Sequence, residues 1–386
     1  MQHASLHKEI HLNDLGVTIQ LTTFAPEGKT AEWHAMLHVA AAGENFTQQY
    51  DKLCQAEAQL LSDEAMQGAK VVMKRYFLSD IANQQHLMKQ TEECAISCIQ
   101  QPPLDGSKVA LWLYMQRGSE VIHSADRLHS TIVRSNGCEH IWTTGMNSEE
   151  GDSFQQTKTL LEDYEDLLSE HQTTLEDNCI RTWFFVRDVD TQYHGLVVAR
   201  RENFDQHGLT AQTHYISSTG IGGNPSAQKA LIQLDSYTIR GFQPEQQRYL
   251  YAPTHLNRTS DYGVTFERGT LMQYGDRNHA FISGTASIDM KGDVVHVGDI
   301  EKQTLRMWEN VEKLLEEADM TMNNTAQAIV YLRDHADYEV VSRMFRDRYP
   351  HLPTVFTLAP VCRPAWLIEM ECIAIKAVAN SSFGDF

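Results

Sequence analysis

Ala328-Ile329-Val330-Tyr331-Leu332-Arg333-Asp334 is a short apolar run that closes on aspartate. Two further runs of this kind occur, Lys74-Arg75-Tyr76-Phe77-Leu78-Ser79-Asp80 and Arg181-Thr182-Trp183-Phe184-Phe185-Val186-Arg187-Asp188. Each run is rich in β-branched and aromatic residues and ends on Asp, which is typical of a strand followed by the start of a helix. One copy lies in each third of the chain, so the sequence indicates an internal repeat.

The elements around the three runs recur in the same order. Before each run, apolar residues three and four apart predict an amphipathic helix, at 46–62, 154–169 and 303–318. After each run a second helix is predicted, at 81–98, 190–204 and 338–348, and then an apolar closing strand, at 109–115, 231–239 and 367–375. With hairpin strands at its start, each unit is a β-α-β-α-β module with helices on one face of a sheet, an α+β fold. We place the modules at 1–130, 131–243 and 244–386.

Composition excludes several classes of partner. The chain has 386 residues and a formal net charge of −19, which disfavours nucleic acid, because affinity for phosphates depends on Lys and Arg. No apolar run approaches the roughly 18 residues of a membrane span, and no signal peptide is visible at the N-terminus. Seven scattered cysteines fit reduced thiols, so we expect a cytoplasmic protein. No HExxH, CxxC, P-loop or GxGxxG pattern occurs, and we expect no metal or cofactor.

The third unit carries a family resemblance. Its segments Phe281-Ile282-Ser283-Gly284-Thr285-Ala286-Ser287, Gly298-Asp299-Ile300 and Trp308-Glu309-Asn310-Val311-Glu312-Lys313-Leu314-Leu315 resemble the Rid/YjgF (endoribonuclease L-PSP-like) superfamily over roughly 270–377. Members of this superfamily are usually trimers with sites in the clefts between subunits. The resemblance therefore implies three chorismate mutase-like modules that form an intramolecular pseudo-trimer, a monomeric chain, and a degenerate first module without a family motif.

A narrower resemblance is to the chorismatases, which belong to the same superfamily. The segments that carry it run in order over about 180–377: Arg181-Thr182-Trp183, Val198-Ala199-Arg200, Ser218-Thr219-Gly220-Ile221-Gly222, Phe266-Glu267-Arg268, and Val361-Cys362-Arg363 with Glu369 seven residues after the cysteine. The chain departs from the family at Tyr215-Ile216-Ser217, which lacks the usual proline, and at Asp289-Met290-Lys291, which replaces a Gly-His pair.

Glu369 is the candidate catalytic acid. On a strand, Glu369 and Glu371 point to the same face, and two carboxylates on an apolar strand are unfavourable unless they are paired or protonated. We expect repulsion and desolvation to raise one pKa towards neutrality. Gln233 occupies the matching place in the second unit, and 110–115 is uncharged in the first, so we predict one functional cleft, where the third module meets the second. Alternatively, both carboxylates face solvent on an edge strand.

The resemblance implies that Glu369 protonates the enolpyruvyl ether of chorismate, after which water captures the cation and pyruvate leaves. Chorismate is a dicarboxylate, so the small anionic substrate needs cationic partners. The candidates for substrate binding are Arg363, Arg268, Arg200, Ser218, Thr219, Gly220, Ser283 and Thr285. The hydroxyls and backbone N–H groups of 218–221 are expected to form an oxygen-binding nest, the alternative being a flexible glycine turn.

Cys362 is a second candidate catalytic residue. A cysteine seven residues before the acid resembles the chorismatase subclass that forms 3-hydroxybenzoate. We expect Arg363 to lower the pKa of this thiol, which would then be a weak nucleophile or a steric gate. The alternative is a small buried apolar residue.

Two other functions remain open. The first is deamination of reactive imines, but the family's deaminases carry an arginine about fifteen residues before the closing Glu, where this chain has Thr354. Arg363 could substitute from the same loop. The second is a non-catalytic module that binds a small molecule. RNA cleavage, sometimes attached to this superfamily, is disfavoured by the charge.

Overall fold

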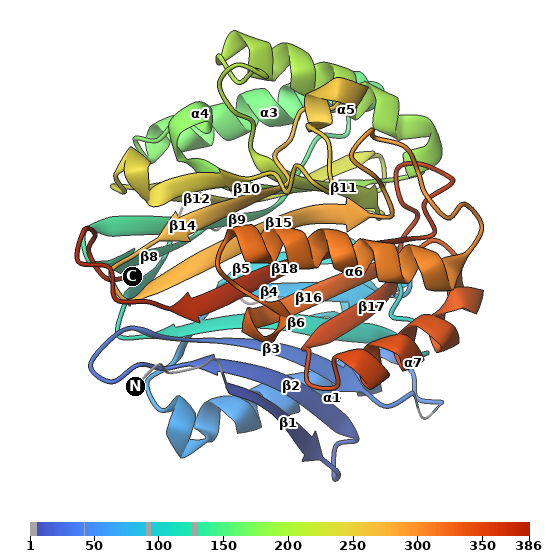
Figure 1. The fold of residues 1–386 in the computed structure, drawn as a ribbon. Coiled ribbons are helices and arrows are strands. Elements are labelled where there is room, and N and C mark those ends of the chain that lie inside the picture. Colours follow the sequence, from blue (N-terminus) through green and yellow to red (C-terminus); the bar gives the residue numbers. More distant parts are fainter. Residues whose placement is uncertain (1–5, 42, 90–93, 125–129) are drawn as a thin grey trace.

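The computed structural model describes residues 6–41, 43–89, 94–124 and 130–386. It contains three six-stranded sheets of the same topology, one from each third of the chain. In Figure 1 the helices lie on the outside, and the three sheets face the centre of the molecule. Among the described residues, no helix is long and apolar enough to cross a membrane. The predicted α+β fold with three tandem modules is confirmed.

Each module runs through the same series of elements. The first has β1 Leu6–Leu12, β2 Val17–Phe24, β3 Ala31–Val39, α1 Phe46–Ser62, β4 Lys70–Leu78, α2 Ile81–Gln84, β5 Ala95–Gln100 and β6 Val109–Arg117. The second has β7 Glu120–His123, β8 Thr131–Ser135, β9 Cys138–Asn147, α3 Ser153–Glu170, α4 Leu175–Asn178, β10 Cys179–Val186, α5 Val189–Gln206, β11 Ser217–Gly222 and β12 Ile232–Arg240. The third has β13 Gln247–Leu250, β14 Gly269–Gln273, β15 Arg277–Ala286, α6 Ile300–Glu317, β16 Thr325–Leu332, α7 Tyr338–Arg348, β17 Thr354–Leu358 and β18 Ile368–Ala377.

The closing strand of each module lies inside its sheet. The strand orders are β1-β2-β3-β6-β4-β5, β7-β8-β9-β12-β10-β11 and β13-β14-β15-β18-β16-β17. The last two strands of each order pair in parallel, and the other neighbours are antiparallel. The three runs that indicated the repeat form β4, β10 and β16, next to the closing strands.

Each module contains one strand more than we predicted, between its second helix and its closing strand. In the first module this strand, β5, replaces part of the helix predicted over 81–98, and α2 ends at Gln84. Along β5 the buried residues are Ala95, Ser97 and Ile99, and this two-residue period is that of a strand and not of a helix. The segment adds a parallel edge to the sheet beside β4, which a helix could not do.

The first module also ends earlier than the predicted boundary at residue 130. β7 pairs with β8 through a ladder from Glu120 and Arg134 to His123 and Thr131, so it belongs to the second sheet. The chain therefore leaves the first sheet after Arg117. The next change of sheet falls between β12 and β13, around the boundary predicted at 243 and 244.

A buried arginine pairs with a carboxylate at each of the three interfaces between modules. Arg75 Nη2 lies 3.0 Å from Asp235 Oδ2, between the first and second modules. Arg181 Nη2 lies 2.8 Å from Glu371 Oε2, between the second and third. Arg277 Nη1 lies 2.6 Å from Glu32 Oε1, between the third and first. All six side chains are at most 2% exposed, so each interface is closed by a desolvated ion pair.

The pair at the third interface is reinforced by neighbours. His279 Nε2 lies 2.8 Å from Glu32 Oε1, and the Tyr114 hydroxyl donates to Glu32 Oε2 at 3.1 Å. Burial alone would raise the pKa of Glu32, but His279 and Arg277 hold it well below its ordinary value. Glu32 is therefore a carboxylate whose charge depends on its partners in the third module.

We expect Arg277→Met to destabilise the protein by about 3–5 kcal/mol, because the substitution removes the guanidinium that pairs with the buried carboxylates of Glu32 and Asp276. Urea denaturation measures the free energy of unfolding. The control is Lys302→Met, which removes the exposed pair of Lys302 with Asp299 on α6 and should leave that free energy unchanged within error. Equal losses in the two variants would contradict the role given to the buried pair.

Three modules that close on one another predict a monomer in solution. Sedimentation of the free chain should give a mass near 43.9 kDa. A tight trimer would contradict this prediction, because the described interfaces already use all three modules.

Candidate active site

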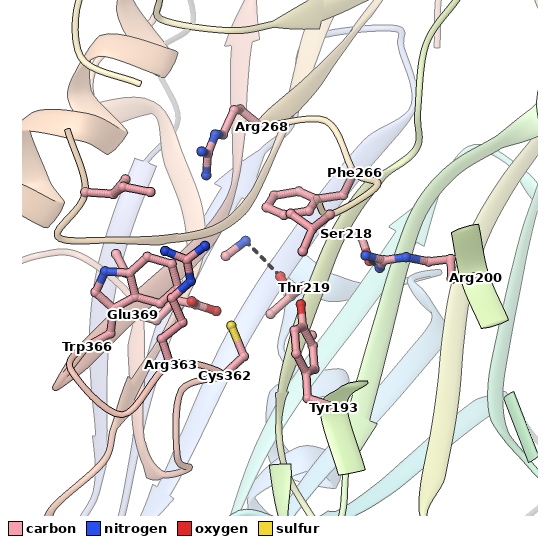
Figure 2. A pocket seen from close by; sticks show the side chains of 15 residues that line it. Tyr193, Arg200, Ser218, Thr219, Phe266, Arg268, Cys362, Arg363, Trp366 and Glu369 are labelled. Carbon is pink, nitrogen blue, oxygen red and sulfur yellow. Dashed lines mark hydrogen bonds between the residues drawn. The ribbon is translucent and has the colours of Figure 1, made fainter. Parts of the chain in front are cut away.

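A cavity of about 180 Å³ lies between the second and third modules, shown in Figure 2. Its walls are Tyr193, Arg200, Ser218, Thr219 and Gly220 from the second module and Val264, Phe266, Arg268, Gly284, Ala286, Ile288, Cys362, Arg363, Trp366 and Glu369 from the third. The cavity brings together eight of the ten site residues expected from the sequence, the exceptions being Ser283 and Thr285.

Strand β11 of the second module lines the cavity and contacts β15 of the third module. Ser218 N donates to Ser283 Oγ at 2.9 Å, and the Thr219 hydroxyl accepts from Gly284 N at 2.9 Å. Residues 217–222 pair with β10 along their whole length, so they are neither the nest nor the flexible turn considered from the sequence. The glycine at 220 is needed because a Cβ there would lie 2.9 Å from the Tyr193 ring.

Glu369 and Glu371 both face the interior. Their strand, β18, lies between β15 and β16, and the two side chains are buried, so the alternative of an exposed edge strand is wrong. Glu371 accepts hydrogen bonds from Arg181 Nη2 at 2.8 Å and Trp183 Nε1 at 2.7 Å, and also from the Thr219 hydroxyl. Glu371 is therefore held as a partnered carboxylate beneath the cavity.

Glu369 is the carboxyl that reaches the cavity. Burial and the neighbouring charge of Glu371 raise the pKa of Glu369 to about 8, although Arg268 and Arg181 oppose the rise. The pKa of this carboxyl is thus raised towards neutrality, in the direction expected from the sequence. Gly284 makes room for it, since a Cβ at that position would collide with Glu369 Oε1.

Three arginines surround the cavity from different sides. In Figure 2, Arg268 and Arg363 lie on the side of Glu369, and Arg200 lies on the opposite side, beyond Thr219. Arg200 is buried and its Nε donates to Thr265 Oγ1 at 3.1 Å. Arg268 is buried and its Nη2 donates to Asn257 Oδ1 at 3.0 Å. Arg363 is half-buried, with its guanidinium 4.8 Å from the centre of the Trp366 ring. The cavity can therefore meet negative charge at two ends of a small molecule.

Cys362 is not the activated thiol that its neighbour Arg363 led us to expect. Burial and the nearby charge of Glu369 raise the pKa of the thiol to about 12, and its hydrogen bond with Tyr193 and the charge of Arg363 offset only part of this. Cys362 lines the cavity as a neutral SH group. The expected lowering of its pKa is wrong because desolvation outweighs one partly exposed guanidinium.

Ser283 and Thr285 lie behind the wall of the cavity and do not line it. The Ser283 hydroxyl donates to Glu267 O at 2.6 Å and accepts from Arg181 Nη1 at 3.2 Å. The Thr285 hydroxyl donates to Ser283 O at 2.8 Å. Both are fully buried, so they hold β11 and β15 in place and are out of reach of a ligand.

Seven wall residues were not named as site candidates from the sequence, and two of these, Tyr193 and Trp366, have polar groups on their side chains. Tyr193 lies seven residues before Arg200 on α5, a spacing that places both on one helix face, so this signal was available. Trp366 follows Arg363 in the same loop, and its Nε1 donates to Ser287 O at 3.0 Å.

Thr354 lies on β17 and lines a different cavity. Among the described residues, no group of three or more His, Cys, Asp or Glu is placed to hold a metal ion.

We expect Glu371→Gln to lower the pKa of Glu369 from about 8 towards its ordinary 4.5, because the substitution removes the adjacent negative charge. An infrared titration of protein labelled with ¹³C-glutamate measures this, and Glu369→Gln identifies the band. Glu316→Gln, on the surface of α6, is the control and should change nothing. An unchanged Glu369 titration in Glu371→Gln would refute the coupling between the two carboxyls.

Comparisons with known proteins agree with this fold. The family described as Endoribonuclease L-PSP matches residues 272–376. A RutC family protein of Pyrococcus abyssi is 33% identical over 101 residues, which are 26% of this chain and 80% of that protein. The 3-aminoacrylate deaminase RutC of Acinetobacter baylyi is 29% identical over 99 residues, 25% of this chain and 79% of that one.

A similarity along nearly the whole chain comes from a solved structure. A crystal structure of chorismatase superimposes with a TM-score of 0.65 and 17% identity, covering 90% of this chain and 100% of that one. At this identity the similarity shows a shared fold. The chorismatase structure shows that all three sheets have this fold, so they are three modules of one kind. With the matches to the RutC relatives, the protein belongs to the Rid/YjgF/L-PSP superfamily.

Proposed function

We propose that this protein is a chorismatase-like enzyme that cleaves the enolpyruvyl ether of chorismate, or of a related small anionic metabolite, and releases pyruvate. The observation that carries the proposal is the buried Glu369 carboxyl, whose pKa is raised to about 8 in a cavity that three arginines line. A protonated acid beside cationic groups suits an anionic substrate that must receive a proton. The fold shared with chorismatase adds support.

In the proposed reaction Glu369 donates its proton to the terminal methylene carbon of the enolpyruvyl group. The vinyl ether becomes an oxocarbenium ion, and the carboxylate left on Glu369 stabilises this cation. Water then adds to the cationic carbon, and the resulting hemiketal collapses to pyruvate and an alcohol. The added water supplies the proton that returns to Glu369, so the enzyme ends the cycle as it began.

The arginines orient the substrate in this proposal. Arg268 and Arg363 lie on the side of Glu369 and would hold the enolpyruvyl carboxylate, since the acid must reach the carbon next to it. Arg200 would hold the ring carboxylate at the opposite end. Ser218 and Thr219 line the path between the two ends and would contact the ring oxygens.

Cys362 acts in this proposal through its size. A thiol with a pKa of about 12 is neutral at physiological pH, so it is a poor nucleophile. It narrows the cavity between Tyr193 and Glu369 and would thereby limit where water or the ring approaches the cation.

Incubation with chorismate, with pyruvate followed by a coupled lactate dehydrogenase assay, tests the proposal. Wild type should release pyruvate, and Glu369→Gln should lose about 10²–10⁴-fold in rate, because general acid catalysis contributes that much. Glu316→Gln serves as the matched surface control. Absence of pyruvate from wild type would refute the proposed reaction, and undiminished release by Glu369→Gln would remove this residue as the acid.

The pH profile is part of the same experiment. Because the reaction needs the protonated form of Glu369, kcat/KM should be level at lower pH and fall as pH rises through about 8. In Glu371→Gln the fall should begin at lower pH. A profile that rises through this range would contradict a general acid at this position.

Imine deamination is a second candidate, favoured by the similarity of the third module to the 3-aminoacrylate deaminase RutC. Ser218 on β11 occupies the position that Thr354 occupies on β17, as the pairing registers of β10 with β11 and of β16 with β17 show. The arginine that the deaminases carry is therefore absent from both positions. Faster release of ammonia from 3-aminoacrylate, without pyruvate from chorismate, would favour this candidate. Binding of chorismate without either product would indicate a module that only binds small molecules.

A further inference from the structure

Five ionisable side chains form a buried cluster at the candidate active site, and all three modules contribute to it. They are Arg75 on β4 of the first module, Arg181 on β10 and Asp235 on β12 of the second, and Glu369 and Glu371 on β18 of the third. Each residue is at most 5% exposed. Of these five, Glu369 is the one that lines the cavity, so the other four lie behind its wall.

Arg75 connects carboxylates of two different modules. Its Nη2 lies 3.0 Å from Asp235 Oδ2, and its Nη1 lies 3.9 Å from Glu371 Oε1. Glu371 Oε2 in turn lies 2.8 Å from Arg181 Nη2. The charges therefore alternate in sign from Asp235 through Arg75 and Glu371 to Arg181. Glu371, which is two residues from Glu369 on the same strand, joins this series to the candidate acid.

Aromatic rings hold the Arg75 guanidinium in this place. Its Cζ lies 4.7 Å from the ring centre of Trp183, 5.1 Å from that of Phe185 and 5.2 Å from that of Trp112. Because rings shield the guanidinium from water, its charge acts strongly on its neighbours. Arg75 Nη1 makes no hydrogen bond in the described part of the chain, so its contact with Glu371 is electrostatic.

Tyr331, on the neighbouring strand β16, lies among these charges. It pairs with Glu369 in the sheet, and its fully buried hydroxyl has no hydrogen-bond partner among the described residues. Burial and the charge of Glu371 raise the pKa of this hydroxyl well above its ordinary value, whereas Arg75 and Arg181 oppose the rise. Tyr331 therefore stays neutral, and the members of the cluster are close enough to act on one another.

The formal charges explain which carboxyl holds a proton. Arg75 and Arg181 carry two positive charges, and the carboxylates of Asp235 and Glu371 cancel them. An ionised Glu369 would be a third carboxylate beside two guanidiniums, out of contact with bulk water, which is unfavourable. The cluster is therefore neutral when its one proton is on Glu369.

The groups on the cavity side of Glu369 do not change this assignment. Arg268, in the segment before β14, lowers the pKa of Glu369, but burial and the charge of Glu371 outweigh it. Arg363 lies on the same side and is partly exposed. Cys362 is a neutral thiol. In the proposed function Arg268 and Arg363 hold a carboxylate of the substrate, so their charges are compensated there.

We propose that Arg75 and Asp235 are positioning residues for the candidate active site. Arg75 keeps Glu371 ionised, and Asp235 cancels the remaining charge of Arg75, so that the proton of the cluster resides on Glu369. The first module thus influences the acid, although none of its described residues lines the cavity. This inference deepens the proposed function, in which Glu369 is the acid, and it can be tested without any substrate.

Infrared titration of the full chain labelled with ¹³C-glutamate tests the proposal. Asp235→Asn leaves two guanidiniums beside Glu371 alone, so the pKa of Glu369 should fall from about 8 to about 7 or below. Adding Arg75→Gln to this variant restores the balance, and the double variant should titrate like wild type. A merely structural disturbance would not be reversed by a second substitution in the core. Asp166→Asn, on the exposed face of α3, is the control and should change nothing.

Two results would overturn the proposal. One is a Glu369 titration that Asp235→Asn leaves unchanged, and the other is an equal fall in the single and the double variant. If Asp235→Asn does not fold, Asp235→Ser takes its place, because serine also removes the charge and is smaller. Absence of chorismate cleavage would refute the proposed function alone, since the titration involves no substrate.

Discussion

The ring of three modules depends on one kind of interaction, a buried arginine that reaches across each interface to a carboxylate of the next module. Removing such charges from water is unfavourable, and only close pairing offsets it. Arg75–Asp235, Arg181–Glu371 and Arg277–Glu32 therefore tolerate few other arrangements of the modules. The pair of Arg181 with Glu371 has a second effect, because the charge of the Glu371 carboxylate adds to burial in raising the pKa of Glu369. Glu371 thus both closes the interface between the second and third modules and raises the pKa of Glu369.

Much of the fold could be predicted because it follows from local periodicity. The helices α3, α6 and α7 begin and end within a few residues of the predicted ranges, since their apolar stripes are long. β5 was mistaken for helix because a six-residue edge strand is too short to show a clear alternation of apolar and polar residues. Its conformation depends on backbone pairing with β4. The predicted boundary at residue 130 left Glu120–His123 in the first unit, whereas these residues form β7 and pair with β8, which comes later in the chain.

The part of the candidate site that lies on a single strand could be predicted from the sequence. Alternation on β18 placed Glu369 beside Glu371, and the raised pKa of Glu369 followed from that proximity. The state of Cys362 did not follow, because the burial that raises the pKa of its thiol arises from the packing of the folded chain and leaves no pattern in the sequence around it. Asp235 went unnoticed as a carboxylate on the second closing strand, because its partner Arg75 is 160 residues away in the chain.

The three interfaces have become chemically different although their backbones match. The second-third interface has the buried Glu369, and the third-first interface has Ala110 at the matching place of the closing strand. At the first-second interface the place of Glu369 is taken by Gln233, whose amide lies 3.4 Å from Ser97 Oγ. Covalent linkage of the three modules makes such divergence accessible. In a trimer of identical subunits any substitution is made three times and every cleft inherits it, whereas here one codon alters one cleft. A single polypeptide can therefore specialise its sites one at a time while the other two interfaces keep the ring together.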